Sequence, residues 1–183
     1  EVKPSVKGKR SAEVIGQASV SESVSQSSMG IRYSFVQHTK EGKDEEVESR
    51  QITGNWSEIR LAVETNVSGY LYVLFPLGNG KWQNLVPTDP GQTRKTEGGI
   101  KVQSFQRVEF SLGQLTSSLG KPVVNTLTVL LSSNPQDDLG QWLGSKDDMP
   151  EQLIERTDGA VFVVQPTPVK EKPLRVKIQL VEE

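Results

Sequence analysis

Apolar and polar residues alternate over several stretches of the chain, most regularly at 31–36, 59–64 and 174–180. Successive side chains of a β-strand point to opposite faces, so alternation is typical of a strand with one buried face. These three stretches are therefore predicted to be half-buried strands.

Two other stretches, 69–76 and 123–133, are apolar at successive positions. This pattern favours central strands that are covered on both faces. We expect the first of them to end at Pro76, because proline has no N–H to donate to a neighbouring strand.

Two hairpins are indicated by their turns. An Asn-Gly pair at 79–80 readily adopts positive φ angles and predicts a tight turn into a returning strand at 81–87. The charged segment 40–46 contains a glycine and predicts a second hairpin, which leads into a strand at 47–52.

The region after residue 104 contains an irregular apolar pattern. Phe105, Val108 and Phe110 alternate imperfectly, which predicts a core strand with a bulge near Gln106–Arg107. A further apolar run at 160–166 is also predicted to be a strand.

Leu139, Trp142 and Leu143 are spaced as i, i+3 and i+4, which predicts a short amphipathic helix, and 149–156 is predicted to be a second one. Neither helix is long enough for a crossover between parallel strands. About nine predicted strands with two such helices favour an all-β fold. We therefore expect an immunoglobulin-like antiparallel β-sandwich with one or two short peripheral helices.

Residues 1–28 contain isolated valines and many serines but no aromatic residue. Such a segment buries too little apolar area to offset its ordering entropy, so we interpret it as a flexible tail. Alternatively, its valines allow it to lie as an extended strand on a neighbouring sheet edge. Residues 29–183 are expected to form a single sandwich domain.

The chain has 183 residues and a formal net charge of -2, which disfavours nucleic acid and anionic membrane surfaces as partners. The absence of cysteine excludes disulfides, zinc–thiolate sites and thiol nucleophiles. The longest apolar stretch, 71–77, is too short to cross a bilayer. Because the chain begins at Glu1 without an apolar signal segment, we expect a processed, exported protein or a fragment.

Candidate catalytic chemistry is sparse. His38 is the only histidine, and the sequence contains no Gly-x-Ser-x-Gly nucleophile motif. A serine hydrolase would depend on His38 alone, so we interpret it as a surface residue at a strand end and predict no enzyme activity. The glycines between 78 and 99 precede no helix and no Gly-Lys-Ser/Thr motif, so no cofactor is expected.

Two acidic pairs, Asp137-Asp138 and Asp147-Asp148, flank the helix predicted around Trp142. Carboxylates are calcium ligands, but this spacing matches no EF-hand loop. Helix capping and solvation explain both pairs, so we predict no metal site and keep weak calcium binding as an alternative.

Aromatic residues gather across the hairpin predicted at residues 70 to 82. Tyr70, Tyr72 and Trp82 lie on it, and together with Trp56 they are candidates to line a carbohydrate or peptide groove. Cross-strand aromatic pairs are common stabilisers of sheets, so we favour packing in the core and keep the groove as the alternative.

Three segments carry a family likeness: residues 59–87 (IRLAVETNVSGYLYVLFPLGNGKWQNLVP), the strand around Phe110, and residues 127–143 (LTVLLSSNPQDDLGQWL). With them, the stretch 31–143 resembles a bacterial family, domain of unknown function 4384. That family occurs in exported or membrane-attached proteins, beside kinase, caspase-like peptidase, helical-repeat or anti-sigma-like modules. The positions that fit its pattern are Asn66, Gly69, Tyr70, Leu71, Tyr72, Val73, Gly80, Trp82, Leu85, Pro87, Ser132 and Pro135.

The chain departs from the family pattern at Gly54, which is followed by asparagine instead of aspartate, and it lacks an Ile-Pro pair before the Phe110 strand. These differences concern loop geometry. The resemblance implies an extracytoplasmic β-sandwich, periplasmic or secreted, and carries over no catalytic residue.

These observations lead to a prediction of function. We expect a non-catalytic accessory or interaction module that contacts a protein partner in the cell envelope. The polar loop 88–99, with Arg94 and Lys95, is a candidate contact surface because functional residues concentrate on loops. Binding of a carbohydrate or cell-wall fragment is the alternative, and a hydrolase is the least favoured.

Overall fold

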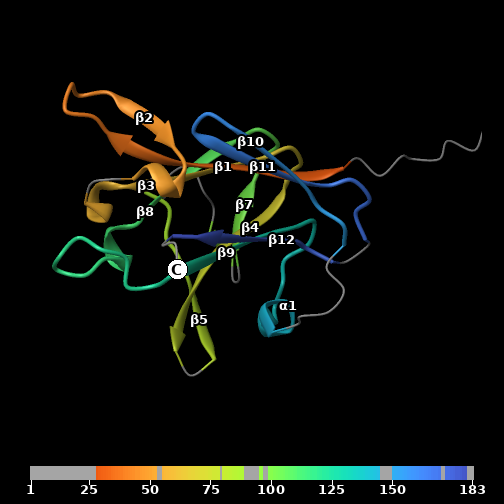
Figure 1. The fold of residues 1–183 in the computed structure, drawn as a ribbon. Helices are drawn as coiled ribbons and strands as arrows, with labels where there is room; N and C mark the ends of the chain where they lie inside the picture. The colour runs from red at the N-terminus through yellow and green to blue at the C-terminus, as the bar shows by residue number, and fades with distance from the viewer. Residues whose placement is uncertain are drawn as a thin grey trace, which may run out of the picture.

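A computed structural model of the chain describes residues 28–52, 55–78, 80–88, 95–96, 99–144, 150–169 and 172–180. Over these residues the chain forms two antiparallel sheets that pack against each other (Figure 1). The expected all-β antiparallel sandwich is therefore confirmed. Residues 1–27, which include almost all of the predicted tail, lie outside the described residues.

The first sheet, which we call the β1 sheet, has β1 at its centre. Its strands in spatial order are β10 (Leu153–Thr157), β11 (Ala160–Gln165), β1 (Met29–His38), β3 (Arg60–Thr65) and β8 (Arg107–Ser111), with β2 (Asp44–Val47) paired to β1. One side of β1 pairs with β3, and the other side pairs first with β11 and then with β2.

The second sheet, which we call the β4 sheet, is built around a long central strand. Its strands in spatial order are β12 (Leu174–Gln179), β9 (Thr126–Ser132), β4 (Gly69–Gly78), β7 (Gly99–Val102) and β6 (Lys95–Thr96), with β5 (Lys81–Asn84) paired to β4. The loop 103–106 passes from β7 of this sheet to β8 of the β1 sheet.

The main core lies between the sheets and follows the alternation of the strands. Phe35 and Leu61 of the β1 sheet are buried there with Leu71, Val73 and their neighbours in the β4 sheet. The outward residues of β4 are buried as well, because a second apolar cluster covers them. The prediction of a central strand covered on both faces is therefore confirmed for 69–76.

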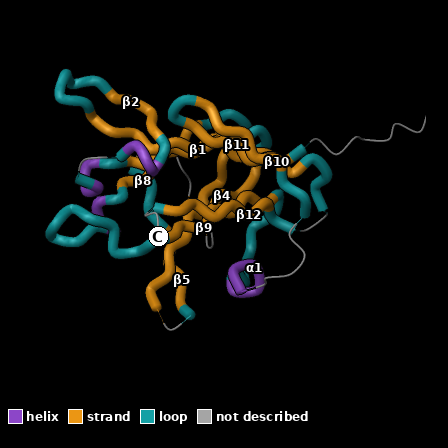
Figure 2. Tube along the Cα trace, viewed as in Figure 1, coloured by secondary structure: helices purple, strands orange, loops and turns teal. Residues whose placement is uncertain are grey.

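Helices are short and lie outside the sheets (Figure 2). They are α1 (Gly140–Gly144) and the 3-10 turns η1 (Ser49–Gln51), η2 (Trp56–Glu58) and η3 (Gly113–Leu115). Leu139, Trp142 and Leu143 pack on the second apolar cluster, so the helix predicted from their spacing is confirmed.

The second helix, predicted at 149–156, is wrong, because Leu153–Thr157 forms the edge strand β10. β10 pairs with β11 across a turn at Asp158 and Gly159, and Gly159 has a φ of 83°. Asp-Gly is a strong signal for a two-residue hairpin, and it outweighs the weak helical pattern before it.

Two strand boundaries also differ from expectation. The strand predicted at 47–52 is wrong, because β2 ends at Val47 and η1 follows; Gln51 Oε1 accepts the N–H of Glu48 at 2.7 Å. β4 does not end at Pro76 but continues to Gly78, with a register shift at this point in its pairing with β5. Proline is tolerated in a strand at such an irregularity.

Candidate functional site

The structure buries two of the aromatic residues expected to line a groove. Trp56 is 8% exposed and packs edge to face on Phe35, with 5.6 Å between the ring centres. Tyr72 is 0% exposed. For these two residues, packing in the core is confirmed and the alternative of an exposed groove is wrong, because both complete apolar clusters.

Tyr70 and Trp82 are partly buried and pack beside Tyr72 in the second apolar cluster. The Tyr72 hydroxyl accepts the N–H of Gln136 at 2.7 Å, and Trp142 Nε1 donates to Gln136 Oε1 at 2.9 Å. Burial raises the pKa of Tyr72. These aromatic residues attach the segment around α1 to the sheet.

Two basic residues of the 88–99 loop, Arg94 and Lys95, were expected to belong to a contact surface. Arg94 lies outside the described residues. Lys95 is placed by its backbone in β6, at the end of the β4 sheet.

His38 lies at the end of β1, as expected for a surface histidine, and its side chain is 60% exposed. Its Nδ1 is 3.0 Å from Asp44 Oδ1, across the β1–β2 hairpin. Asp44 also binds Arg60, and the hydrogen bond with His38, followed by that with Arg60, lowers its pKa.

Of the four aspartates considered for calcium, Asp147 and Asp148 lie outside the described residues. Asp138 accepts the N–H of Gly140 at 2.9 Å at the beginning of α1, and Asp137 is exposed. Over the described residues, no group of three His, Cys, Asp or Glu side chains is placed to hold a metal ion.

The outer face of the β1 sheet carries a network of ion pairs, which we call the outer-face network. Its members are Arg32, Asp44, Glu46, Arg60, Glu64, Arg107 and Glu109. Each of the three arginines contacts at least two carboxylates, so their charges are matched within the sheet. Arg60 Nη1, for example, is 2.8 Å from Glu109 Oε2.

Two small residues are buried among the residues of the outer face. Ser34 and Ala62 pair with each other on the outer face, between the rows of charged residues, yet each is only 1% exposed. Side chains at alternate positions share a face, so the arginines and glutamates of the network flank this pair on the outer face.

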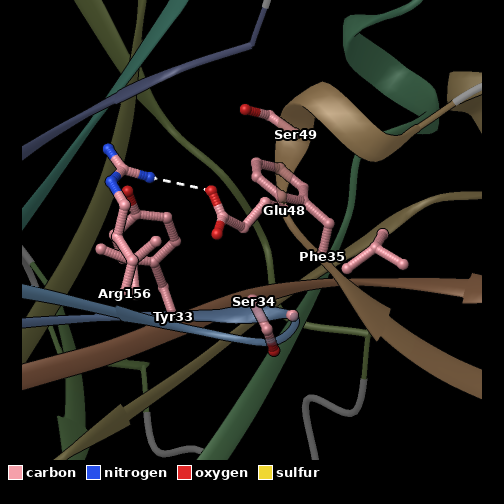
Figure 3. Close-up of a pocket in the computed structure, with 9 residues that line it drawn as sticks. Tyr33, Ser34, Phe35, Glu48, Ser49 and Arg156 are labelled. Atoms are coloured by element: carbon pink, nitrogen blue, oxygen red, sulfur yellow. Dashed lines mark hydrogen bonds and ion pairs between the residues drawn. The ribbon is translucent and has the colours of Figure 1, made fainter.

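A small cavity lies where β1 exchanges β11 for β2 as its neighbour (Figure 3). Glu48, which is 7% exposed, is 3.0 Å from Arg156 and 3.4 Å from Arg50. Tyr33 lies beside Arg156, and burial raises its pKa although Arg156 opposes the shift. The cavity has about 10 Å³, room for about one water. The cavity is therefore a small packing gap at the junction of β1, β2 and β11.

A larger hollow, which we call the apolar hollow, opens on the outer face of the β1 sheet. It has a volume of about 160 Å³. Its lining includes Phe105, Phe162, Val164, Gly30 and Asn66. Phe105 is 75% exposed, so it is an aromatic wall that faces solvent.

The backbone holds Phe105 in this position. It is the only non-glycine residue described with a positive φ, 60°. The turn 103–106 places it there, because Gln106 N–H donates to the Gln103 carbonyl at 3.1 Å. The N–H of Phe105 donates to the carbonyl of Thr65 at 2.6 Å. A left-handed conformation costs about 1 to 2 kcal/mol for a residue with a side chain.

The sequence placed Phe105 in the core, and that prediction is wrong. β8 begins only at Arg107, and a turn stands where a bulge was expected near Gln106–Arg107. The break in alternation was a real signal of irregular backbone. It did not indicate on which side of the sheet the ring would lie.

The polar groups around the apolar hollow are already engaged. Asn66 Oδ1 accepts the N–H of Gly30 at 2.6 Å, and Asn66 Nδ2 donates to the Ser28 carbonyl at 2.8 Å. Arg32 binds Glu46 and Glu64 and lies over the ring of Phe162, 5.7 Å from its centre. What the hollow offers to a ligand is therefore apolar contact.

No described helix has the length and apolar character needed to span a membrane. No protein-family model matches the chain, no curated protein matches it, and no solved structure matches it. The likeness of 31–143 to the bacterial family named above therefore stays a prediction.

Proposed function

We propose that this chain is a non-catalytic interaction module that binds a protein partner through the apolar hollow on its β1 sheet. The observation that carries the proposal is Phe105, 75% exposed and held at a positive φ beside this hollow. Backbone strain concentrates at binding sites, and exposed apolar residues that gather at a hollow are typical of contact surfaces.

Two features support a non-catalytic role. His38, the only histidine, is exposed and binds Asp44, which is also held by Arg60. The second feature is the outer-face network, whose carboxylates and arginines are paired with one another. A catalytic acid or base must be free to exchange a proton with a substrate, whereas the side chains of this network are engaged with one another.

The place of this module in the cell is also part of the proposal. The likeness of 31–143 to an exported bacterial family supports a bacterial cell-envelope location, periplasmic or secreted. The partner is then another protein of the envelope or of a larger parent protein.

Site-specific crosslinking tests the proposal. A photoreactive benzoyl-phenylalanine is introduced at position 105 or, as a matched control, at position 119, where Leu119 is 83% exposed in the loop after η3. Each chain is irradiated with an envelope extract of the source organism. We expect one dominant adduct from position 105 and none from position 119.

Competition identifies adducts that depend on the hollow. An excess of unlabelled wild-type chain should remove the adduct, whereas an excess of Phe105→Gly should not. Glycine accepts a φ of 60°, so Phe105→Gly is expected to unfold at the same urea concentration as the wild type or a higher one. Identical adducts from both positions, or competition by Phe105→Gly, would contradict the proposal.

A further inference from the structure

We infer that the apolar hollow receives a single aromatic side chain from an uncharged segment of the partner protein. This inference rests on the proposed function and names the chemistry of the contact. The size of the hollow, its aromatic walls and the engaged polar groups around it support this occupant.

The size of the hollow fits one ring. Its volume is about 160 Å³. An apolar cavity of about 150 Å³ is large enough to bind benzene. A single phenyl group therefore fills the space, whereas a small aliphatic side chain leaves part of it empty.

The walls favour an aromatic occupant. Phe105 and Phe162 both line the hollow, and Val164 lies on the same outer face as Phe162. Aromatic rings prefer offset-stacked or edge-to-face contacts with other rings. Arg32 already lies over the ring of Phe162, so this wall is held in place before a ligand arrives.

The polar neighbours disfavour a charged or hydroxyl-rich ligand. Asn66 and Arg32 are engaged with Gly30, Glu46 and Glu64. A polar ligand would lose its hydrogen bonds to water and find these groups occupied, which costs binding energy. A sugar is therefore a poor occupant. We expect the segment of the partner that carries the aromatic residue to be uncharged.

The occupant is expected to belong to a protein because the contact area extends beyond the hollow. The exposed ring of Phe105 projects into solvent, and a free ring inside the hollow would leave its outer side in water. Leu153 of β10 pairs with Val164 and is 57% exposed on the same face. A protein surface covers both residues at once.

The test is a titration of the full chain in which the amide chemical shifts are monitored by NMR. The probes are N-acetyl-phenylalanine amide, N-acetyl-glutamine amide and N-acetylglucosamine. We expect saturable shifts at Gly30, Arg32 and Thr65 with the phenylalanine probe. Binding of the glutamine and sugar probes is expected to be at least tenfold weaker.

Three variants locate the binding. Phe105→Gly removes a wall, and Val164→Trp fills the hollow on a strand that tolerates large aromatic residues. Both variants should bind the phenylalanine probe at least tenfold more weakly than the wild type. Leu119→Gly, which also removes an exposed apolar side chain, should bind the probe as the wild type does.

The outcomes separate this inference from the proposed function. If the position-105 adduct forms but the phenylalanine probe binds no better than the glutamine probe, the aromatic preference is wrong and the interaction module stands. If the probe binds the hollow but no protein adduct forms, the hollow is a site for a free aromatic ligand and both proposals fail. Preferential binding of N-acetylglucosamine overturns the aromatic occupant.

Discussion

At the scale of single residues, two glycines with the same backbone conformation have different surroundings. Gly159 in the β10–β11 turn has a φ of 83°, and Gly80 in the β4–β5 turn has a φ of 72°. A Cβ added to Gly159 would lie 2.3 Å from the carbonyl oxygen of Glu46, whereas one added to Gly80 meets nothing within 4 Å. The β10–β11 turn is therefore packed against β2.

This difference predicts unequal costs for the same substitution. Gly80→Ala should lower the free energy of unfolding by about 1 kcal/mol, the cost of a left-handed alanine. Gly159→Ala adds a clash with backbone that cannot move aside easily, so we expect a loss of about 3 kcal/mol. Urea unfolding of the two variants measures this; equal losses would show that the turn does not pack tightly on β2.

At the scale of elements, β1 organises its sheet because different neighbours share its length. β11 pairs with its first half and β2 with its second half, while β3 runs along the other side. The outer-face network joins β2, β1, β3 and β8 across this arrangement. Glu46 of β2 is central, because it contacts both Arg32 and Arg107.

Glu46 makes the stability of this sheet depend on pH. Burial alone raises the pKa of Glu46, but hydrogen bonds from Arg32 and Arg107 outweigh it and lower the pKa below 4.5. A lowered pKa in the folded state stabilises the fold above the unfolded pKa, and this stabilisation is lost as the pH falls through the lowered value.

We therefore expect Glu46→Gln to lose about 1 kcal/mol of unfolding free energy at pH 7. The difference from the wild type should shrink towards zero as the pH falls through the lowered pKa of Glu46, because below that value the wild-type carboxyl is protonated in the folded state too. Chemical unfolding at pH 7 and at acidic pH measures both values. Glu45→Gln, at an exposed neighbour, is the control and should change little; a pH-independent effect of Glu46→Gln would refute the explanation.

At the scale of the whole molecule, the two apolar clusters have different roles. The main core joins the two sheets, and Leu71 of β4 is completely buried in it. The second cluster lies on the outer face of the β4 sheet. Leu139 and Trp142 pack against it and are only partly buried. The first holds the sandwich together, and the second attaches a peripheral segment.

Matched leucine substitutions test this division. Leu71→Ala should cost about 3 kcal/mol, because it leaves a cavity between the sheets. Leu139→Ala should cost about 1 kcal/mol, because a half-buried side chain loses less apolar contact. Calorimetry and tryptophan fluorescence of both variants measure the losses; similar values would mean that the segment around α1 is an integral part of the core.

Local pattern was sufficient for most strands. Alternation located the strands at 31–36, 59–64 and 174–180, and continuous apolar runs located the two central strands, β4 and β9. The fold class followed, since these patterns report burial directly. The helix around Trp142 was also found from its spacing.

Patterns failed where a distant contact decides the conformation. The segment 149–156 has the composition of a short helix, but β10 forms because β11 is available as a partner. Trp56 and Tyr72 were candidates for a groove on their residue type alone, and only packing shows that they are buried. Phe105 was predicted to lie in the core because it is apolar, whereas its side chain is 75% exposed.

The sequence by itself determined the all-β character of this protein and the position of most strands, because these depend on residue types and on spacing along the chain. Only the tertiary structure decided which aromatic residues are buried and which one is exposed. The apolar hollow combines residues from β1, β3, β11 and the loop before β8, and contacts between such distant segments have no periodicity along the chain.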